Sequence, residues 1–442
     1  MIKKDYGAIE IKRGEIVFDG VDLKRISKEY ETPFFLMSER QLESNYESFL
    51  KAFSGIAQFR VFYSVKTNFE SGVLKTLHRL GSGAEISGGQ DFLLARKAGF
   101  APRNIVFDGP CKKDAEIIEA IEGGVHCINA ESIEELEKIE KISSKAGARV
   151  NVGIRVDPLV DSHYYDALID TYKRKFGYPV REAMGIFALA RQFPHLNLMA
   201  IHAHIGSQLF DISMYTRSLD SIFRLISELK KIGVEIKELN IGGGFPAQGM
   251  RNVKISRRLI AAQLLERLGF NIERNVPSIF DFGKQISDAY NRNSEKYGVN
   301  PVLTTEPGRC IVSSVAILVG KVVSQKRNWV FTDISVNDIA ENIFFSERDY
   351  GFPGKMGAKI KRVVNISGPT LSTADVLYLK EKVPGLEAGD PIVIFDVGAY
   401  SIPRSTQFTQ PRKAVYFITK DREIKLIRAR ETYEDVIKNQ VW

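Results

Sequence analysis

Lys66 has a sequence environment that could make its side-chain amine reactive. It follows a run of apolar and β-branched residues, 59–65, which predicts a buried strand that ends at the lysine. Burial disfavours a charged ammonium, so we expect it to lower the pKa of Lys66 and to make the amine a nucleophile toward a carbonyl carbon. A lysine at a strand end can also extend into solvent, so the rest of the chain has to decide between these two interpretations.

Two other motifs carry groups that could act together with such a lysine. Residues 305–309 read Thr-Glu-Pro-Gly-Arg and place Glu306 at a strand end, before a rigid turn and Arg309. Residues 242–244 are three consecutive glycines, whose backbone can approach a phosphate without interference from Cβ atoms. Alone, the 305–309 motif is equally typical of a surface turn with a salt bridge, and the three glycines are equally typical of a flexible turn. A lysine for a Schiff base, a carboxylate for a heteroaromatic nitrogen and a phosphate cradle together are what a pyridoxal phosphate site requires.

The elements that must position these residues are short apolar strands that alternate with amphipathic helices. The strands are expected at 59–66, 81–87, 104–108, 126–129, 150–156, 198–205, 236–241 and 302–305, with a long polar connection between 157 and 185. This is the size and rhythm of a (β/α)₈ barrel, although a doubly wound sheet has a similar period. In a barrel, functional residues lie at the carboxyl ends of the strands, and Lys66, Glu85, His204, Ser207 and Glu306 all fall there.

The texture of the chain changes after about residue 309. Helical periods fade, and strands are expected at 316–324, 329–332, 362–366, 391–397 and 414–419. This pattern predicts a second domain that is mostly β. Short strands are also expected near the amino terminus, at 8–11 and 15–18.

Composition excludes several classes of function. The 442 residues are 44% hydrophobic and 26% charged, and the net charge of +8 is spread along the chain without a block of basic residues, so nucleic-acid binding is not expected. No apolar run approaches the roughly 18 residues that span a bilayer, and residues 1–19 lack the apolar segment of a signal peptide. Cys111, Cys127 and Cys310 have no metal-like spacing, nor do the six histidines, so no metal site is expected and a reducing cytoplasm is the favoured location.

Taken together, the motifs resemble those of the fold-type III pyridoxal-phosphate decarboxylases, the group that contains diaminopimelate, ornithine and arginine decarboxylases. The diaminopimelate decarboxylases are the most similar in texture. The matching segments run in order along nearly the whole chain: 63–68, 83–89, 202–208, 242–244, 306–309, 389–390 and 398–400. The resemblance implies an alanine-racemase-like (β/α)₈ TIM barrel that binds pyridoxal 5′-phosphate, at residues 34–308. It also implies a C-terminal β domain, a β-sandwich or barrel, at 309–442, which the N-terminal strands of residues 1–33 join.

The resemblance also implies a role for each matched position. Lys66 would hold the cofactor through a Schiff base, Glu306 would pair with the pyridine nitrogen, and His204 would stack on the ring; these three are the expected catalytic residues. Glu85 would lie near Lys66, and His202 is expected to pack in the barrel wall. The positions expected around the phosphate are Ser207, Gly242, Gly243, Gly244, Gly308, Arg309 and Tyr400. Members of the family are homodimers whose active sites form at the interface, where the loop that begins at Gly368-Pro369 reaches in from the partner subunit.

Two segments depart from the family pattern. Where the family loop carries Gly-Pro-x-Cys-Glu-Ser-x-Asp, residues 368–375 place Leu371 at the cysteine, Ser372 at the glutamate and Asp375 at the final aspartate. Because leucine cannot donate a proton, water or another group, such as Lys66, must complete the reaction. In an ungapped alignment, Glu341 stands at the arginine of the Arg-Pro-x-x-Tyr segment that binds the distal carboxylate of diaminopimelate.

The charge reversal at Glu341 bears on the substrate. A carboxylate that faces another carboxylate would cost several kcal/mol of binding, on the order of a broken buried pair. Ordinary diaminopimelate is therefore not the expected substrate; Glu341 fits a cationic or hydrogen-bond-donating distal group, or else it faces solvent. The expected function is decarboxylation of an amino acid or an amino-acid derivative. Two alternatives stay open: a racemase or epimerase at Cα, for which Tyr164, Tyr165 and Tyr172 have no assigned place, and a cofactor-binding protein with decayed catalysis.

Overall fold

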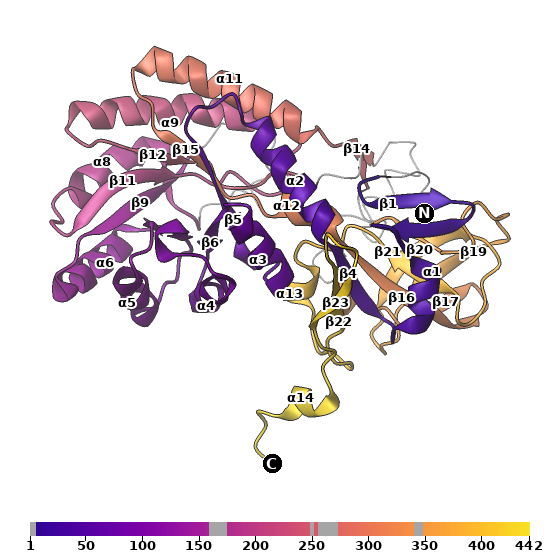
Figure 1. The fold of residues 1–442 in the computed structure, drawn as a ribbon. Coiled ribbons are helices and arrows are strands. Elements are labelled where there is room, and N and C mark those ends of the chain that lie inside the picture. Colours follow the sequence, from indigo (N-terminus) through magenta and orange to yellow (C-terminus); the bar gives the residue numbers. More distant parts are fainter. Residues whose placement is uncertain (1–5, 159–174, 248–251, 255–272, 340–347) are drawn as a thin grey trace.

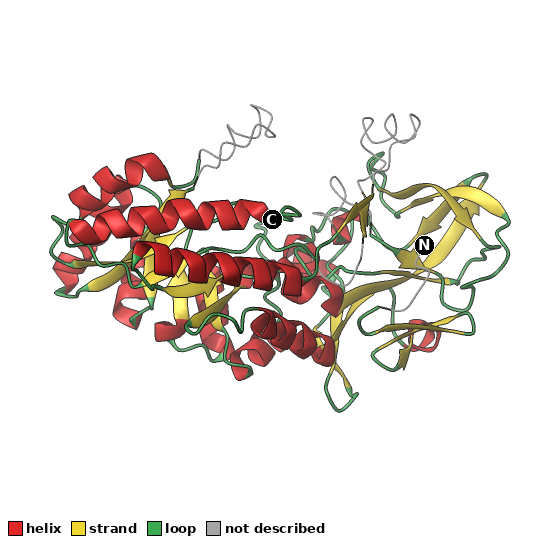
Figure 2. Cartoon of the chain, turned by 90° about the horizontal axis from the view of Figure 1, so that it is seen from above, coloured by secondary structure: helices red, strands yellow, loops and turns green. Residues whose placement is uncertain are grey.

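The chain forms a barrel of strands surrounded by helices and, beside it, a domain built mainly of strands (Figures 1 and 2). The structure is a computed structural model, and it describes residues 6–158, 175–247, 252–254, 273–339 and 348–442. Within these residues no helix is both long and apolar enough to cross a membrane. The expected combination of a (β/α)₈ barrel with a mostly β second domain is confirmed.

Eight parallel strands close the barrel, because the last of them pairs with the first. In order of the chain they are β5 (Phe59–Ser64), β6 (Gly83–Ile86), β7 (Ile105–Phe107), β8 (Cys127–Ala130), β9 (Val150–Asp157), β11 (Leu196–His202), β12 (Glu238–Asn240) and β15 (Val302–Thr305). All eight overlap the strands expected from the sequence. The agreement follows from the apolar runs, since strands covered by helices on the outside and by neighbours within are buried on both faces.

Helices cover the outside of the barrel (Figure 1). They are α2 (Glu39–Ala52), α3 (Ser71–Arg79), α4 (Gly89–Ala98), α5 (Asp114–Gly123), α6 (Ile133–Ala146), α8 (Val180–Ala190), α9 (Ser213–Lys231) and α11 (Ile279–Tyr297). The hydroxyl of Ser38 accepts a hydrogen bond from the Gln41 N–H and caps α2. The helix α8 corrects the expectation of a polar connection through residue 185, because Ala183, Phe187 and Ala190 form a buried face there.

The interior of the barrel is layered. At the amino ends of the strands, the His126 Nε2 lies 2.8 Å from Glu238 Oε2, and the Thr304 hydroxyl donates to the other oxygen of Glu238. An apolar layer of Phe62, Val106, Cys127, Met199 and Ala200 lies in the middle. A second polar layer occupies the carboxyl ends and belongs to the site described below.

The second domain contains one large sheet and a small one. The strands of the large sheet are β4 (Phe34–Ser38), β16 (Ala316–Lys326), β17 (Trp329–Thr332), β18 (Tyr350–Gly351), β19 (Arg362–Ser367), β20 (Val376–Val383), β21 (Pro391–Ile394), β22 (Ala414–Ile418) and β23 (Ile424–Arg428). The small sheet consists of β1 (Ile9–Lys12), β2 (Glu15–Phe18) and β3 (Val21–Asp22), followed by α1 (Leu23–Glu29). Ile9, Ile16 and Phe18 share one hydrophobic core with Phe34 and Ile317 of the large sheet.

The strand β4 corrects one sequence-based boundary. It pairs antiparallel with β16 and parallel with β22, so residues 34–38 hydrogen-bond to the second sheet and not to the barrel. The boundary at residue 34 assigned this strand to the barrel, because an apolar run does not reveal which sheet it joins. The other domain boundaries stay predictions. At the carboxyl terminus, α14 (Tyr433–Ile437) extends away from the body of the molecule (Figure 1).

Candidate active site

A cavity of about 460 Å³ lies at the carboxyl ends of the barrel strands. Of the residues expected from the sequence to bind the cofactor, all except Gly242 line this cavity. They are Lys66, Glu85, His204, Ser207, Gly243, Gly244, Glu306, Gly308, Arg309 and Tyr400. Tyr400 comes from the second domain, and the others come from the barrel and the turn that follows it. Residues scattered from position 66 to position 400 therefore share one wall of solvent-accessible space.

Lys66 is held by Glu85. The strand β5 ends at Ser64, and Lys66 lies in a 3₁₀ turn (Val65–Thr67) and not at the strand end that the sequence suggested. Its Nζ donates to both carboxylate oxygens of Glu85, each at 2.6 Å. Glu85 is fully buried and also accepts a hydrogen bond from the Ser87 hydroxyl, at 2.9 Å. The amine is thus fixed at one point of the cavity wall.

The pKa of Lys66 corrects another expectation. Burial lowers the pKa of Lys66, as predicted, but the charge and hydrogen bonds of Glu85, with contributions from Tyr400 and Glu306, outweigh it and raise the pKa above its ordinary value. The side chain is 45% exposed, toward the cavity, and this exposure weakens the effect of burial. In the structure the amine is therefore a paired ammonium, which must lose a proton before it can attack a carbonyl carbon.

Replacement of Glu85 should reverse this shift. We expect Glu85→Gln to lower the pKa of Lys66, so that the free amine forms at lower pH and the pH midpoint of its reaction with an aldehyde falls by about one unit or more. The measurement is the rate of borohydride-trapped pyridoxal addition to Lys66 in cofactor-free protein, as a function of pH. Glu135→Gln is the control, because Glu135 pairs with the buried Lys112 at 3.0 Å and not with Lys66. An unchanged midpoint in Glu85→Gln would contradict the assignment.

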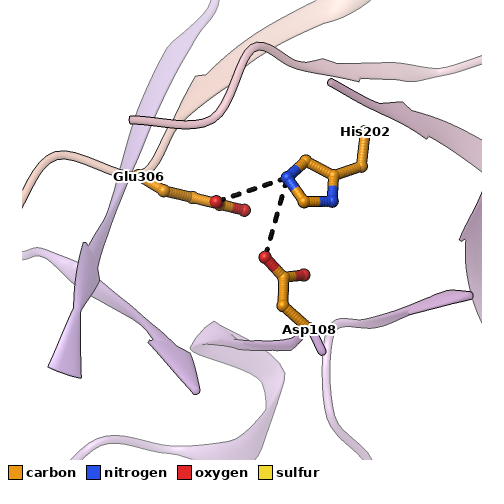
Figure 3. Close-up of side chains that lie close together, drawn as sticks. All are labelled: Asp108, His202 and Glu306. Carbon is orange, nitrogen blue, oxygen red and sulfur yellow. Dashed lines mark ion pairs between the residues drawn. The ribbon is translucent and has the colours of Figure 1, made fainter. Parts of the chain in front are cut away.

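Three buried side chains form the base of the cavity: Asp108, His202 and Glu306 (Figure 3). The His202 Nε2 lies 3.4 Å from Glu306 Oε2 and 3.6 Å from Asp108 Oδ2. The other oxygen of each carboxylate accepts a hydrogen bond from an amide, from Asn240 Nδ2 to Glu306 at 2.6 Å and from Asn129 Nδ2 to Asp108 at 2.7 Å. Each of the three side chains offers one nitrogen or oxygen atom that lies within 4.8 Å of those of the other two. This arrangement could also hold a metal ion, and the positions of the residues along the sequence could not reveal it.

The charges of this cluster influence one another. Burial raises the pKa of Glu306 and the negative charge of Asp108 raises it further, while His202 acts in the opposite direction. Burial lowers the pKa of His202, but the two carboxylates outweigh burial and raise it. Burial also disfavours ionised Asp108, yet His202 and the Asn129 hydrogen bond hold the pKa of Asp108 below its usual value. The net effect raises the pKa of Glu306 to about 7, while the ionised Asp108 carboxylate favours the imidazolium form of His202.

His204 lies next to the turn formed by the three glycines 242–244, the glycine turn. Its Nδ1 accepts a hydrogen bond from the Gly243 N–H at 3.2 Å, so the ring proton of the neutral form is on Nε2. Burial lowers the pKa of His204, and the positive charges of Arg155, His202 and Lys66 lower it further. The imidazole that lines the cavity is therefore neutral near pH 7.

The glycine turn is required by the packing of the protein itself. A Cβ atom on Gly243 would overlap the Glu306 carbonyl oxygen, and one on Gly244 would lie 2.5 Å from the Gly206 carbonyl oxygen. The Glu306 N–H donates to the Gly242 carbonyl oxygen at 2.9 Å, which ties the turn to the segment that carries the carboxylate. The glycines thus bring the turn close to Glu306, in addition to opening the backbone toward the cavity as the sequence suggested.

We expect Gly243→Ala to damage both stability and the site. The new Cβ must displace the Glu306 backbone, so the free energy of unfolding should fall by about 1–3 kcal/mol and the affinity for the cofactor should fall with it. Urea unfolding and equilibrium dialysis measure the two effects. Gly185→Ala in α8 is the control, because its Cβ would meet nothing within 4 Å and alanine favours a helix. Equal stability of the two variants would contradict the prediction.

The second domain is attached to the Lys66 turn by two hydrogen bonds. The Tyr400 N–H donates to the Thr67 carbonyl oxygen at 2.8 Å, and Asn68 Nδ2 donates to the Gly398 carbonyl oxygen at 2.8 Å. Tyr400 adopts a left-handed backbone with φ of 59°, which is rare for a residue with a side chain. Its ring faces the Arg309 guanidinium at 4.9 Å. This contact places a cation and a phenol side by side at the edge of the cavity.

Several residues of the site were missed by the sequence analysis. Arg155 lines the cavity, forms a 2.5 Å ion pair with Glu131 and lies over the Phe176 ring. Asp108 and Arg155 stand at the ends of expected strands, so the rule that pointed to Glu306 could have found them. His202, expected to be a packing residue, is buried but faces the two carboxylates.

Other expected site residues lie elsewhere. Leu371 is fully exposed, and neither it nor Ser372 nor Asp375 lines the cavity. Asp375 is buried and accepts hydrogen bonds from Ser335, Val336 and Thr370, which fix the base of the 368–375 loop. Glu341 lies outside the described residues, and so do Tyr164, Tyr165 and Tyr172.

The residues present fit pyridoxal phosphate. The cavity has the volume of a small-molecule site, about 460 Å³. An amine and a buried carboxylate, those of Lys66 and Glu306, line it together with the Arg309 guanidinium. The backbone at Gly243 and Gly244 lies so close to the carbonyl oxygens of Glu306 and Gly206 that side chains are excluded at both positions. These are the groups needed for an aldehyde, a ring nitrogen and a phosphate.

Comparisons with known proteins agree with this fit. The family model described as "Pyridoxal-dependent decarboxylase, pyridoxal binding domain" matches residues 39–313. The diaminopimelate decarboxylase of Methanocaldococcus jannaschii is 30% identical over 445 residues, covering 98% of this chain and 96% of that protein. Its crystal structure superposes with a TM-score of 0.86, at 29% identity and 98% coverage of both chains. The Helicobacter pylori diaminopimelate decarboxylase complexed with L-lysine gives a TM-score of 0.80 at 25% identity, covering 94% of this chain and 98% of that one.

Proposed function

We propose that the cavity at the carboxyl ends of the barrel is the active site of this chain, which belongs to the pyridoxal-dependent decarboxylase family. Members of this family remove a carboxyl group from an amino acid. In this proposal, Lys66 is the attachment point of the cofactor. The observation that supports this placement most strongly is that Lys66, Glu306 and Tyr400, from distant parts of the chain, line one cavity. A decayed protein would have no need to keep them together.

The chain supplies specific groups for the chemistry of pyridoxal phosphate. When bound, this cofactor provides an electron-accepting ring that stabilises the negative charge left on the substrate after carbon dioxide departs. Glu85, 2.6 Å from Lys66 Nζ, is placed to accept the proton that the amine must lose. The buried Glu306 carboxylate would pair with the ring nitrogen and keep it protonated. The neutral imidazole of His204 would lie against the ring without adding a competing charge.

The phosphate end of the site would combine backbone and charge. Ser207, Gly243 and Gly244 would supply donors, with Gly242 and Gly308 shaping the turns around them. Arg309 would neutralise the phosphate, and Tyr400, 4.9 Å from its guanidinium, would hold that cation in place. Because Tyr400 is also bonded to the Lys66 turn, the two ends of the cofactor site are mechanically connected.

We keep an amino acid other than ordinary diaminopimelate as the proposed substrate. The relatives are named diaminopimelate decarboxylases, and one was solved with L-lysine. The reason for a different distal group is Glu341, which stands in the place of an arginine. A contact between Glu341 and the substrate stays a prediction. A substrate with a cationic or hydrogen-bond-donating distal group satisfies that glutamate.

We also propose that the active enzyme is a cytoplasmic homodimer with active sites at the interface. The 368–375 loop supports this arrangement, because Asp375 anchors its base while Leu371 at its tip is fully exposed. In the homodimer that we propose, the partner surface would cover Leu371. Sedimentation with and without pyridoxal phosphate tests the oligomeric state.

One experiment tests the function. The protein loaded with pyridoxal phosphate is incubated in D₂O with meso-diaminopimelate, L-lysine, L-ornithine, L-arginine and L-glutamate, and NMR follows the carboxyl carbon and Cα. We expect loss of carbon dioxide with deuterium at Cα for a basic amino acid, and slower or no turnover of diaminopimelate. Exchange at Cα without loss of carbon dioxide would replace decarboxylation by racemisation. Absence of both reactions with every compound would contradict a free amino acid as the substrate.

A further inference from the structure

His202 is the central residue of the polar layer beneath the cavity. It ends β11 and is 2% exposed, and its Nε2 lies between Glu306 Oε2 at 3.4 Å and Asp108 Oδ2 at 3.6 Å (Figure 3). Neither carboxylate is free to turn away, because Asn240 and Asn129 hold their other oxygens. The imidazole and the two carboxylates therefore face one another in a fixed arrangement.

Two buried carboxylates this close together are costly unless a cation joins them. Each loses hydration in the barrel, and each repels the other, so without compensation one of them takes up a proton. A protonated Glu306 would be a hydrogen-bond donor at the position where the cofactor nitrogen needs an anion. The ionisation of Glu306 therefore depends on a nearby positive charge.

The other cations that line the cavity have partners of their own. Lys66 donates to both oxygens of Glu85, and Arg155 forms a 2.5 Å ion pair with Glu131. Arg309 lies against the Tyr400 ring, at the phosphate edge. Among the described residues, His202 is the basic group that forms an ion pair with Glu306.

We propose that His202 is a positioning residue: as an imidazolium between Asp108 and Glu306, it favours the ionised form of Glu306 and orients that carboxylate to pair with the ring nitrogen of the cofactor. Asp108 stabilises the imidazolium of His202, since its carboxylate supplies the second negative charge beside it. This inference rests on the proposed function, because it requires Glu306 to meet the ring nitrogen. It assigns His202 no contact with substrate and no proton transfer.

The test compares two cofactors that differ at the ring nitrogen. Pyridoxal phosphate and its 1-deaza analogue, which has a carbon in place of that nitrogen, share the aldehyde and the phosphate, so only the first can respond to the charge of Glu306. Equilibrium dialysis against the cofactor-free full-length protein gives both Kd values. We expect the preference for pyridoxal phosphate over the analogue to fall at least about tenfold in His202→Asn and in His202→Gln, the equivalent of one pKa unit at Glu306.

Two variants make the result specific. His126→Asn is the matched control, because His126 is also a histidine inside the barrel that pairs with a buried carboxylate, Glu238, at 2.8 Å, but at the opposite end of the strands. It should leave the preference between the two cofactors unchanged. Glu306→Gln should lose the preference at least as strongly as the His202 variants, and it tests the proposed function itself.

The outcomes separate the two proposals. Equal weakening of both cofactors, or no change, in the His202 variants would overturn the role of His202 while Glu306→Gln still loses the preference. An unchanged preference in Glu306→Gln would overturn the pairing of Glu306 with the ring nitrogen and the inference with it. Failure of both His202 variants to fold, seen by circular dichroism, would overturn the inference in favour of a purely structural histidine.

Discussion

Lys66→Arg is expected to abolish covalent binding of pyridoxal phosphate and to lower kcat/KM by at least about 10³-fold. Arginine stays protonated at any accessible pH, so it cannot add to an aldehyde. Its guanidinium can still form a bidentate pair with Glu85, which keeps the local structure and limits the loss of stability. Borohydride reduction followed by mass spectrometry of the intact protein measures the covalent bond, and release of carbon dioxide measures turnover.

The control for this prediction is another lysine from the same region. Lys75→Arg changes an exposed residue of α3 and should leave both measurements unchanged. Trapped cofactor in Lys66→Arg would show that another amine binds it. The lysine to examine next would be Lys112, whose buried ammonium donates to the Gly109 and Asn129 carbonyl oxygens beside Asp108.

Glu306→Gln should lower kcat by about 10²–10³-fold, the usual effect of removing one preorganised electrostatic contact from an active site. The amide has nearly the shape of the carboxylate and can still accept from Asn240, so the loss of charge is the main change. On the proposed pairing, the ring nitrogen of the cofactor would no longer be held protonated without that charge, and the site would stabilise negative charge on the substrate less well. Steady-state kinetics with saturating cofactor separate this effect from weaker cofactor binding.

Glu238→Gln provides a matched comparison at the other end of the barrel. Glu238 is also buried and pairs with a histidine, His126, at 2.8 Å, but it lies outside the cavity. We expect it to lower the free energy of unfolding by about 1–3 kcal/mol, because its hydrogen-bond partners lose an anionic acceptor. Its kcat should stay within about twofold of the unmodified enzyme, since nothing at the cavity changes. Equal losses of kcat in the two variants would show that Glu306 acts through stability alone.

The secondary structure and most of the candidate site could be predicted from the sequence. Apolar runs and helical periods are local signals, and they located the eight barrel strands because each strand is buried on both faces. The carboxyl end of each strand, together with the turn that follows it, is then a known region, which placed Lys66, Glu85, His204 and Glu306 at one edge. The order of several such motifs along the chain indicated the family and its cofactor before any geometry was known.

Tertiary structure decided what depends on contacts between distant segments. The apolar run of β4 joined the second sheet, and Gly243 proved to be necessary for the approach of Glu306. The pKa of Lys66 is raised because Glu85, from the next strand, faces it in the same cavity.

His202 reads as a packing residue until Asp108 and Glu306 are seen on either side of it. Patterns along the chain determine which residues are buried and on which element. The charge that a buried group carries depends on its neighbours in space, because electrostatic interactions in a low-dielectric interior follow distance and not sequence.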